Sequence, residues 1–151
     1  MLSYLQVRAL IRGILQSDNA TKQELGRRFA AHLGLTPGPR GPDDGIDGIV
    51  LHEGRKIHFQ CKLRSTPLDK DDAREYYSDL KYHGVGVSIM LAGVDYKDTF
   101  KKRLFEHPDI QDIRIHLLTL RDLFEESDNY KKALHDLPQL GGLTAVAGRP
   151  S

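Results

Sequence analysis

Three polar residues, Asp47, Gln60 and Lys62, are of the types that hold a divalent cation beside a phosphodiester. An aspartate carboxylate and a glutamine amide supply oxygen ligands of the kind that Mg²⁺ prefers, and a lysine ammonium can steady an attacking water. Because only one residue separates Gln60 from Lys62, a strand would point both side chains to the same face of a sheet. The residue types and their spacing therefore indicate a metal-dependent site for phosphodiester chemistry.

The segment that carries these residues is predicted to form two strands joined by a tight turn. We expect one strand over about 46–51, a turn at Glu53 and Gly54, and a second strand over about 56–64. Apolar and polar residues alternate along the second strand, so the apolar row should face the core and the polar row should be free for chemistry. The apolar row is Ile57, Phe59, Cys61 and Leu63, and the polar row is His58, Gln60, Lys62 and Arg64.

An Asp-x-Gly-x-Asp-Gly stretch at 43–48 and a later Gln-x-Lys at 60–62 together resemble the PD-(D/E)XK nuclease superfamily, with the closest likeness to the catalytic domains of Mrr-type restriction endonucleases. The resemblance covers about residues 20–126. It implies that Asp47 binds Mg²⁺, with Mn²⁺ able to substitute, and that Gln60 replaces the more usual second carboxylate. It also implies that the backbone carbonyl of Cys61 is a further ligand and that Lys62 orients or activates water.

A glutamine brings one negative charge less to the metal than a carboxylate does, so another acid should compensate. By the same resemblance, Glu24 on the helix before the motif is the leading candidate for a metal ligand and catalytic residue. The alternative is a capping box in which Glu24 pairs with Thr21, and the sequence leaves both interpretations open. For Asp43 and Asp44, which lie in a loop rich in proline and glycine, turn formation is favoured over metal binding.

Nucleic-acid binding requires positive charge near the site. Arg64 and His58 share the predicted face of Lys62, and Arg28 and Arg40 lie on nearby segments, so these four are the candidate phosphate contacts. For His58 a solvated strand position is favoured over a phosphate contact. The basic cluster within 97–103 is more typical of an ordinary solvated helix face.

The flanking sequence predicts the elements that hold this site in place. Apolar residues at helical or strand spacing, together with capping and breaking residues, define eight further segments. They are helices at about 4–16 and 22–33, a helix that ends at Gly84, a strand at 85–91, a helix at 96–106, a strand at 113–118 and helical segments through 120–124 and 130–137. This order predicts an α/β, restriction-endonuclease-like sandwich whose mixed central sheet of about four strands is flanked by helices.

Length and composition limit the function classes. At 151 residues the chain fits a single nuclease-like domain, 1–151, in which the first helix lies outside the resemblance and residues 138–151 form a loose tail. With 22 basic and 21 acidic residues the net charge is +1, so nucleic-acid affinity must come from a local basic surface. A single cysteine excludes an internal disulfide, and no long apolar run is present. We therefore expect a cytoplasmic protein with no membrane contact.

These observations predict a Mg²⁺-dependent DNA endonuclease that acts in bacterial or phage restriction, defence or DNA processing. The alternatives are a catalytically inactive nuclease-fold module that binds nucleic acid or a protein partner, and a junction resolvase or RNA endonuclease with the same site. Because the chain has no room for a separate DNA-reading domain, we expect a homodimer or a partner subunit that supplies specificity.

Overall fold

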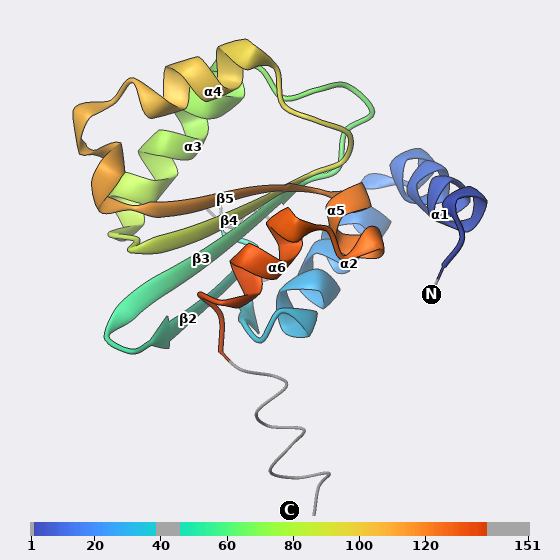
Figure 1. The fold of residues 1–151 in the computed structure, drawn as a ribbon, viewed down its shortest axis with the longest axis horizontal. Coiled ribbons are helices and arrows are strands. Elements are labelled where there is room, and N and C mark those ends of the chain that lie inside the picture. The colour runs from blue at the N-terminus through green and yellow to red at the C-terminus, as the bar shows by residue number, and fades with distance from the viewer. Residues whose placement is uncertain (1, 39–45, 139–151) are drawn as a thin grey trace, which may run out of the picture.

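The computed structural model describes residues 2–38 and 46–138. Over these residues the chain forms a five-stranded mixed sheet with helices on both faces (Figure 1). The elements in chain order are α1 (Tyr4–Gln16), α2 (Asn19–His32), β1 (Thr36–Pro37), β2 (Gly48–His52), β3 (Arg55–Lys62), α3 (Lys70–His83), β4 (Val87–Ala92), α4 (Asp98–Phe105), the 3-10 helix η1 (Pro108–Asp112), β5 (Arg114–Thr119), α5 (Leu120–Glu125) and α6 (Asp128–Leu134).

The strands lie side by side in the order β1-β2-β3-β4-β5. The pairs β1–β2 and β2–β3 are antiparallel, whereas β3–β4 and β4–β5 are parallel and are connected through α3 and through α4 with η1. The predicted α/β sandwich with a mixed sheet is confirmed. The sheet has one strand more than the expected four, because β1 is a two-residue edge strand that contains Pro37 and is too short for an alternating pattern.

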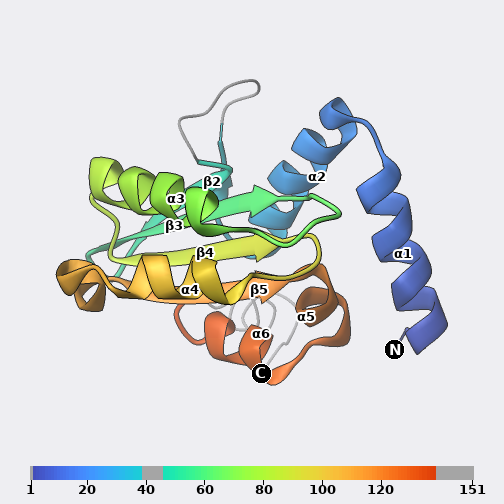
Figure 2. The ribbon, with the colours of Figure 1, turned by 90° about the horizontal axis from the view of Figure 1, so that it is seen from above.

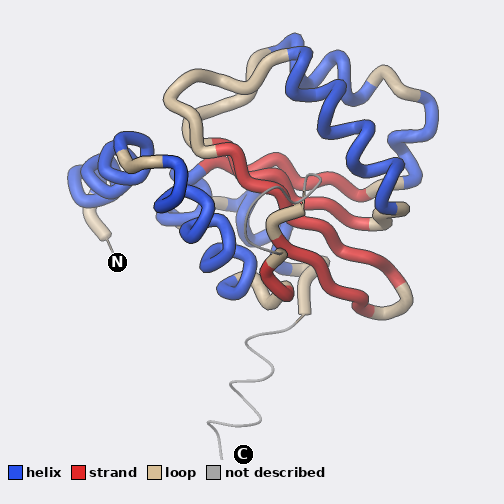
Figure 3. Tube along the Cα trace, turned by 180° about the vertical axis from the view of Figure 1, so that it is seen from behind, coloured by secondary structure: helices blue, strands red, loops and turns tan. Residues whose placement is uncertain are grey.

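Two apolar cores lie on the two faces of the sheet. Residues such as Phe59 and Leu118 pack against α2, α5 and α6, while Met90 packs with Tyr76 and Phe100 against α3 and α4. Figure 2 shows the α3–α4 layer running along the strands, with α1 beyond the end at which β3 and β4 finish. Figure 3 shows the same separation of α1 from the α3–α4 layer from behind.

The expectation that the whole polar row of β3 would be free for chemistry is wrong at two positions. His58 is 0% exposed and Gln60 is 4% exposed, because the crossover helix α3 covers that face of the sheet. Strands of the parallel part of a sheet are usually covered on both faces. Only Lys62 and Arg64, at the end of the row, reach a surface pocket.

Helix boundaries follow from capping groups. The predicted capping box at Thr21 is wrong: Asp18 caps α2, with its carboxylate accepting from the Thr21 N–H at 2.8 Å, so Thr21 lies inside the helix. At the start of α3 a capping box between Asp69 and Asp72 is present, and Gly84 ends that helix at φ 62°. The predicted tail falls outside the described residues from 139 onward. No described helix combines the length and apolar character that crossing a membrane would require.

Candidate active site

The site begins at a fork between β2 and β3. Gly48, the first residue of β2, lies opposite Phe59, so β3 continues to Lys62 without a partner strand on that side. Asp47 sits at the fork: its N–H donates to the Phe59 carbonyl at 2.9 Å, and its Oδ2 accepts from the Cys61 N–H at 2.7 Å. The Asp47 carboxylate thus accepts the hydrogen bond that a backbone carbonyl of β2 would accept if that strand continued. This bond fixes the orientation of the carboxylate.

Close packing of α2 explains Gly48, the glycine that follows this aspartate. A Cβ on Gly48 would lie 2.6 Å from the Ala30 Cβ, so no larger residue fits there without movement of the helix. A Cβ on Gly26 would lie 3.7 Å from the Asp47 Cγ. The helix therefore forms one wall of the site and approaches the carboxylate through small residues.

Cys61 contributes main-chain groups to the fork. The carbonyl of the next residue, Lys62, accepts from the Gly93 N–H on the β4 side, and successive residues of a strand direct their N–H and C=O groups to alternate edges. The Cys61 carbonyl is therefore directed to the edge that β2 leaves, where the sequence predicts a metal ligand. Burial, and secondarily the negative charge of Asp47, raise the pKa of the Cys61 thiol well above its usual value, so the thiol stays neutral.

A pocket of about 530 Å³ opens at this fork between α2, the end of β3 and α3. Four residues singled out by the sequence line it, namely Asp47, Cys61, Lys62 and Arg64. Two acids of α3 line the opposite wall: Glu75 Oε1 lies 3.3 Å from Lys62 Nζ, and Asp72 forms an ion pair with Arg64. Lys22 of α2 also lines the pocket, which therefore combines carboxylates with three cationic side chains, the groups that phosphate chemistry requires.

Gln60 is not among the residues that line this pocket. Its side chain is directed toward α3, where it forms a hydrogen bond with Asp79. Its Oε1 is buried and has no hydrogen-bond partner among the described residues. An acceptor left unpaired in this way typically costs about 1–3 kcal/mol, which a bound cation or water would offset.

Two acids on α3 were missed by the sequence interpretation. Glu75 and Asp79 are one helical turn apart and lie near Gln60 and Lys62. Burial first, and then the negative charge of Glu75, raise the pKa of Asp79, while Gln60 and Lys62 act in the opposite direction. The i, i+4 spacing of two acids on the helix after β3 was the available signal in the sequence.

Several predicted site residues lie away from the pocket. At about 100° per residue, Glu24 and Arg28 lie roughly 140° and 180° around α2 from Asn19, which lines the pocket. Glu24 Oε1 instead lies 3.7 Å from Arg27 Nε, and Arg28 is exposed.

The remaining predicted contacts are also placed differently or are not described. His58 Nδ1 lies 2.9 Å from the Ser88 hydroxyl and the residue is fully buried, so neither the solvated position nor the phosphate contact predicted for it is correct. Arg40, Asp43 and Asp44 fall outside the described residues.

The donor set fits a hard cation better than zinc. Among the described residues no three His, Cys, Asp or Glu side chains are grouped as metal ligands, but the predicted set consists of one carboxylate, one amide and one main-chain carbonyl. All three are oxygen donors, and Glu75 and Asp79 add negative charge nearby. The orphaned Gln60 Oε1 is the observation that fits a cation most directly.

No protein-family model matches the chain, and no curated protein matches it. The resemblance to Mrr-type nucleases therefore stays a prediction from the motif residues and the order of the elements.

Proposed function

We propose that the chain is a Mg²⁺-dependent endonuclease that hydrolyses phosphodiester bonds in DNA. The observation that carries this proposal is the convergence of Asp47, Lys62 and Arg64 on one pocket at the β2–β3 fork. An oriented carboxylate, a lysine and an arginine in one pocket are the groups that phosphodiester hydrolysis with a bound cation requires. The α/β sandwich and the Gln-x-Lys motif support the same function.

Each residue has a role that its contacts suit. Asp47 is held by the Cys61 N–H, so its carboxylate is oriented before any ligand arrives. Glu75 steadies the ammonium of Lys62, which orients the attacking water or donates to a phosphate oxygen. Arg64, next along the chain on the same face, offers a planar guanidinium to a neighbouring phosphate.

The cation would be held at the fork by the Asp47 carboxylate and the Cys61 carbonyl. Gln60 Oε1 lies under α3, with Glu75 and Asp79 as the supporting negative charge. Mg²⁺, or Mn²⁺ in its place, would supply charge stabilisation on the phosphate and a bound water of lowered pKa. Glu75 and Asp79 on α3 take the compensating role that the sequence interpretation gave to Glu24.

The biological setting that suits this activity is DNA restriction, defence or processing in the cytoplasm of a bacterium or phage-infected cell. A homodimer with two-fold symmetry would bring two sites to opposite strands of a duplex. Specificity would then come from the dimer or from a partner subunit.

Cleavage by a Lys62→Ala variant tests the enzyme proposal. Loss of the ammonium that handles the water should lower the rate on supercoiled plasmid in Mg²⁺ or Mn²⁺ by at least about 100-fold. Lys101→Ala, at an exposed position of α4 far from the fork, is the matched control and should cleave like the wild type. Far-ultraviolet circular dichroism and melting curves should show that both variants are folded.

Two results would end the proposal. One is a folded wild-type protein that leaves duplex, methylated, branched, single-stranded DNA and RNA equally intact with and without Mg²⁺ or Mn²⁺. The other is a Lys62→Ala variant that cleaves as fast as the wild type.

A binding module without catalysis is the second candidate, because Gln60 replaces an acid and does not share the pocket of Asp47. Calorimetric titration of the protein with Mg²⁺ and Mn²⁺, in the presence of a phosphorothioate duplex, separates the two. Uptake of one or more ions favours the enzyme, and no uptake favours the module.

A further inference from the structure

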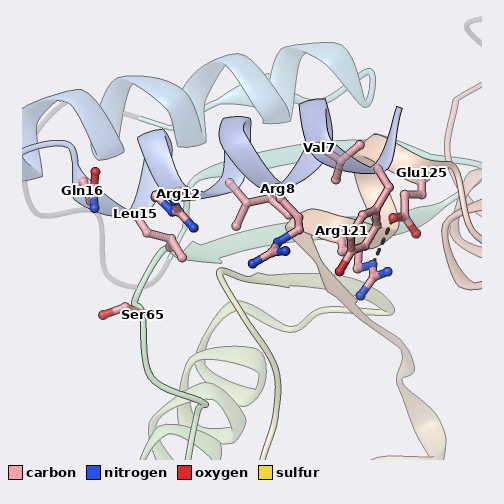
Figure 4. A pocket seen from close by; sticks show the side chains of 10 residues that line it. Val7, Arg8, Arg12, Leu15, Gln16, Ser65, Arg121 and Glu125 are labelled. Atoms are coloured by element: carbon pink, nitrogen blue, oxygen red, sulfur yellow. Dashed lines mark hydrogen bonds and ion pairs between the residues drawn. The ribbon is translucent and has the colours of Figure 1, made fainter. Parts of the chain in front are cut away.

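A second pocket, also of about 530 Å³, lies between α1, α5 and the segment that follows β3. Its base is apolar and is formed by one face of α1, from which Val7, Ile11 and Leu15 point inward. Its rim is cationic: Arg8 and Arg12 come from α1, and Arg121 comes from α5 (Figure 4). We refer to this surface, defined by Arg8, Arg12 and Arg121, as the arginine groove.

The positive charge of the arginine groove is only partly neutralised. Arg121 Nε lies 3.0 Å from Glu125 Oε2, whereas α1 contains no acidic residue. Neither Arg8 nor Arg12 has an ion-pair partner among residues 2–38 and 46–138. The helix therefore carries two like charges at i, i+4, an arrangement that weakens a helix slightly and that a bound anion would reverse.

Tyr4 adds an aromatic surface to the groove. The guanidinium carbon of Arg8 lies 5.6 Å from the centre of the Tyr4 ring, and that of Arg121 lies 5.3 Å from it. Cation–π contacts of this kind bring guanidinium groups from two helices to one aromatic ring. Arg8 and Arg121 are thus gathered at one place, and Arg12 lines the same pocket one turn along α1.

The groove adjoins the candidate active site. Arg64 lines the active-site pocket and the next residue, Ser65, lines the groove; likewise Gln16 lines the groove and Asn19, after the short link between α1 and α2, lines the active-site pocket. Packing fixes this arrangement, because a Cβ on Gly93 would lie 2.6 Å from Leu15 of α1 and 2.5 Å from the Arg64 carbonyl. Helix α1 is therefore docked at the strand ends beside the fork.

We propose that the arginine groove binds backbone phosphates of the nucleic-acid strand that flanks the bond held at the fork. This inference rests on the proposed nuclease function, since it assumes that the phosphodiester bound near Lys62 positions the neighbouring nucleotides of the same nucleic-acid strand. A chain of net charge +1 needs a local basic surface to hold a polyanion, and three guanidinium groups over an apolar base supply one. The helix outside the family resemblance thereby becomes the part of this chain that extends the substrate contact.

Binding of a labelled duplex in EDTA, measured by fluorescence anisotropy over a series of salt concentrations, tests the groove without any cleavage. The Arg8→Ala/Arg12→Ala double variant should lose at least about 10-fold in affinity, and the slope of log K against log salt should become shallower by about 2. The Arg8→Lys/Arg12→Lys variant keeps the charge and should keep the salt slope. Arg74→Ala/Lys101→Ala removes two exposed positive charges from α3 and α4 and should bind like the wild type.

The outcomes separate this inference from the nuclease proposal. Equal losses in the double variant and in the Arg74→Ala/Lys101→Ala control would overturn it, as would an unchanged affinity in the double variant. Flotation with phosphatidylserine vesicles that depends on Arg8 and Arg12, without any effect on DNA, would assign the groove to a membrane surface instead. If the wild type binds DNA through these arginines but cleaves nothing, the groove stands and the nuclease proposal falls.

The folding of the variants is checked independently. Melting curves establish whether the alanine double variant is folded, and Arg8→Gln/Arg12→Gln replaces it if it is not, because glutamine keeps the helix propensity and the side-chain stem. A folded glutamine variant that binds with wild-type affinity and salt slope also overturns the inference.

Discussion

The molecule contains two polar clusters that are built in opposite ways. The β3–α3 cluster consists of Gln60, Glu75 and Asp79. The second cluster lies where β5 meets the end of α6 and consists of Arg114, His116 and Asp136. At β5, Asp136 is 9% exposed and both of its carboxylate oxygens have partners: Arg114 Nη1 at 2.9 Å and His116 Nε2 at 2.6 Å. At β3, the buried Gln60 Oε1 has no partner, and Asp79 lies near a second acid, Glu75. At β5 every carboxylate oxygen of the cluster is paired, whereas the cluster at β3 has an unpaired acceptor and an excess of negative charge.

The titration of the two aspartates reflects this difference. Burial acts to raise the pKa of Asp136, but the hydrogen bond with His116 and the charge of Arg114 outweigh it and leave the pKa lowered. For Asp79 burial and Glu75 prevail, and the pKa is raised. A saturated cluster ties α6 to the sheet, whereas an unsaturated one retains binding capacity at the expense of stability, as functional sites often do.

The substitution Gln60→Glu should have the largest effect on this comparison. It places a third carboxylate beside Glu75 and Asp79 in a buried position, so we expect the metal-free protein to lose about 3 kcal/mol of unfolding free energy. Saturating Mg²⁺ should restore more stability in this variant than in the wild type, because the ion binds only the folded state. Urea unfolding with and without Mg²⁺ measures both quantities.

The control for this substitution is Gln111→Glu, which makes the same charge change at an exposed residue of η1. It should alter stability by less than about 0.5 kcal/mol and leave the response to Mg²⁺ unchanged. If Mg²⁺ stabilises Gln60→Glu no more than this control, the β3–α3 cluster is not a cation site.

The substitution Asp136→Asn should have the next largest effect, without any dependence on Mg²⁺. It removes the charged acceptor of Arg114 and His116, so we expect a loss of about 2 kcal/mol at pH 6. Because the folded-state pKa of Asp136 is lowered, its contribution is fully present above the unfolded value of about 3.9 and is lost as the pH falls through the folded value. Urea unfolding of the two proteins should therefore differ at pH 6 and converge toward pH 3; a constant difference would contradict this account.

The sequence predicted the helices and strands that local residue patterns determine. It failed to predict which side chains are buried when one element packs over another. Apolar spacing located α1 and β3, and Asp47 and Lys62, which the motif singled out, line one pocket. The burial of Gln60 depends on which face α3 crosses, and the alternation of β3 carries no information about that. Glu75 and Asp79 were missed for the same reason, because helical spacing does not tell which flank of α3 meets the sheet.

The substitution Asp79→Asn should produce the smallest effect, and its sign is opposite to that of Asp136→Asn. Since the folded-state pKa of Asp79 is raised, its carboxylate form is disfavoured by folding, and wild-type stability is lost as the pH rises from about 4 through the folded value. Asparagine cannot ionise and keeps a similar shape beside Gln60, so we expect a gain of up to about 1 kcal/mol at pH 7 and none at pH 3. Urea unfolding at these two pH values measures the gain, and a loss of stability at pH 7 would mean that the β3–α3 cluster is as well compensated as the one at β5. If Asp79→Asn is more stable than the wild type and also binds Mg²⁺ more weakly, the charge that destabilises the fold is the charge that binds the ion.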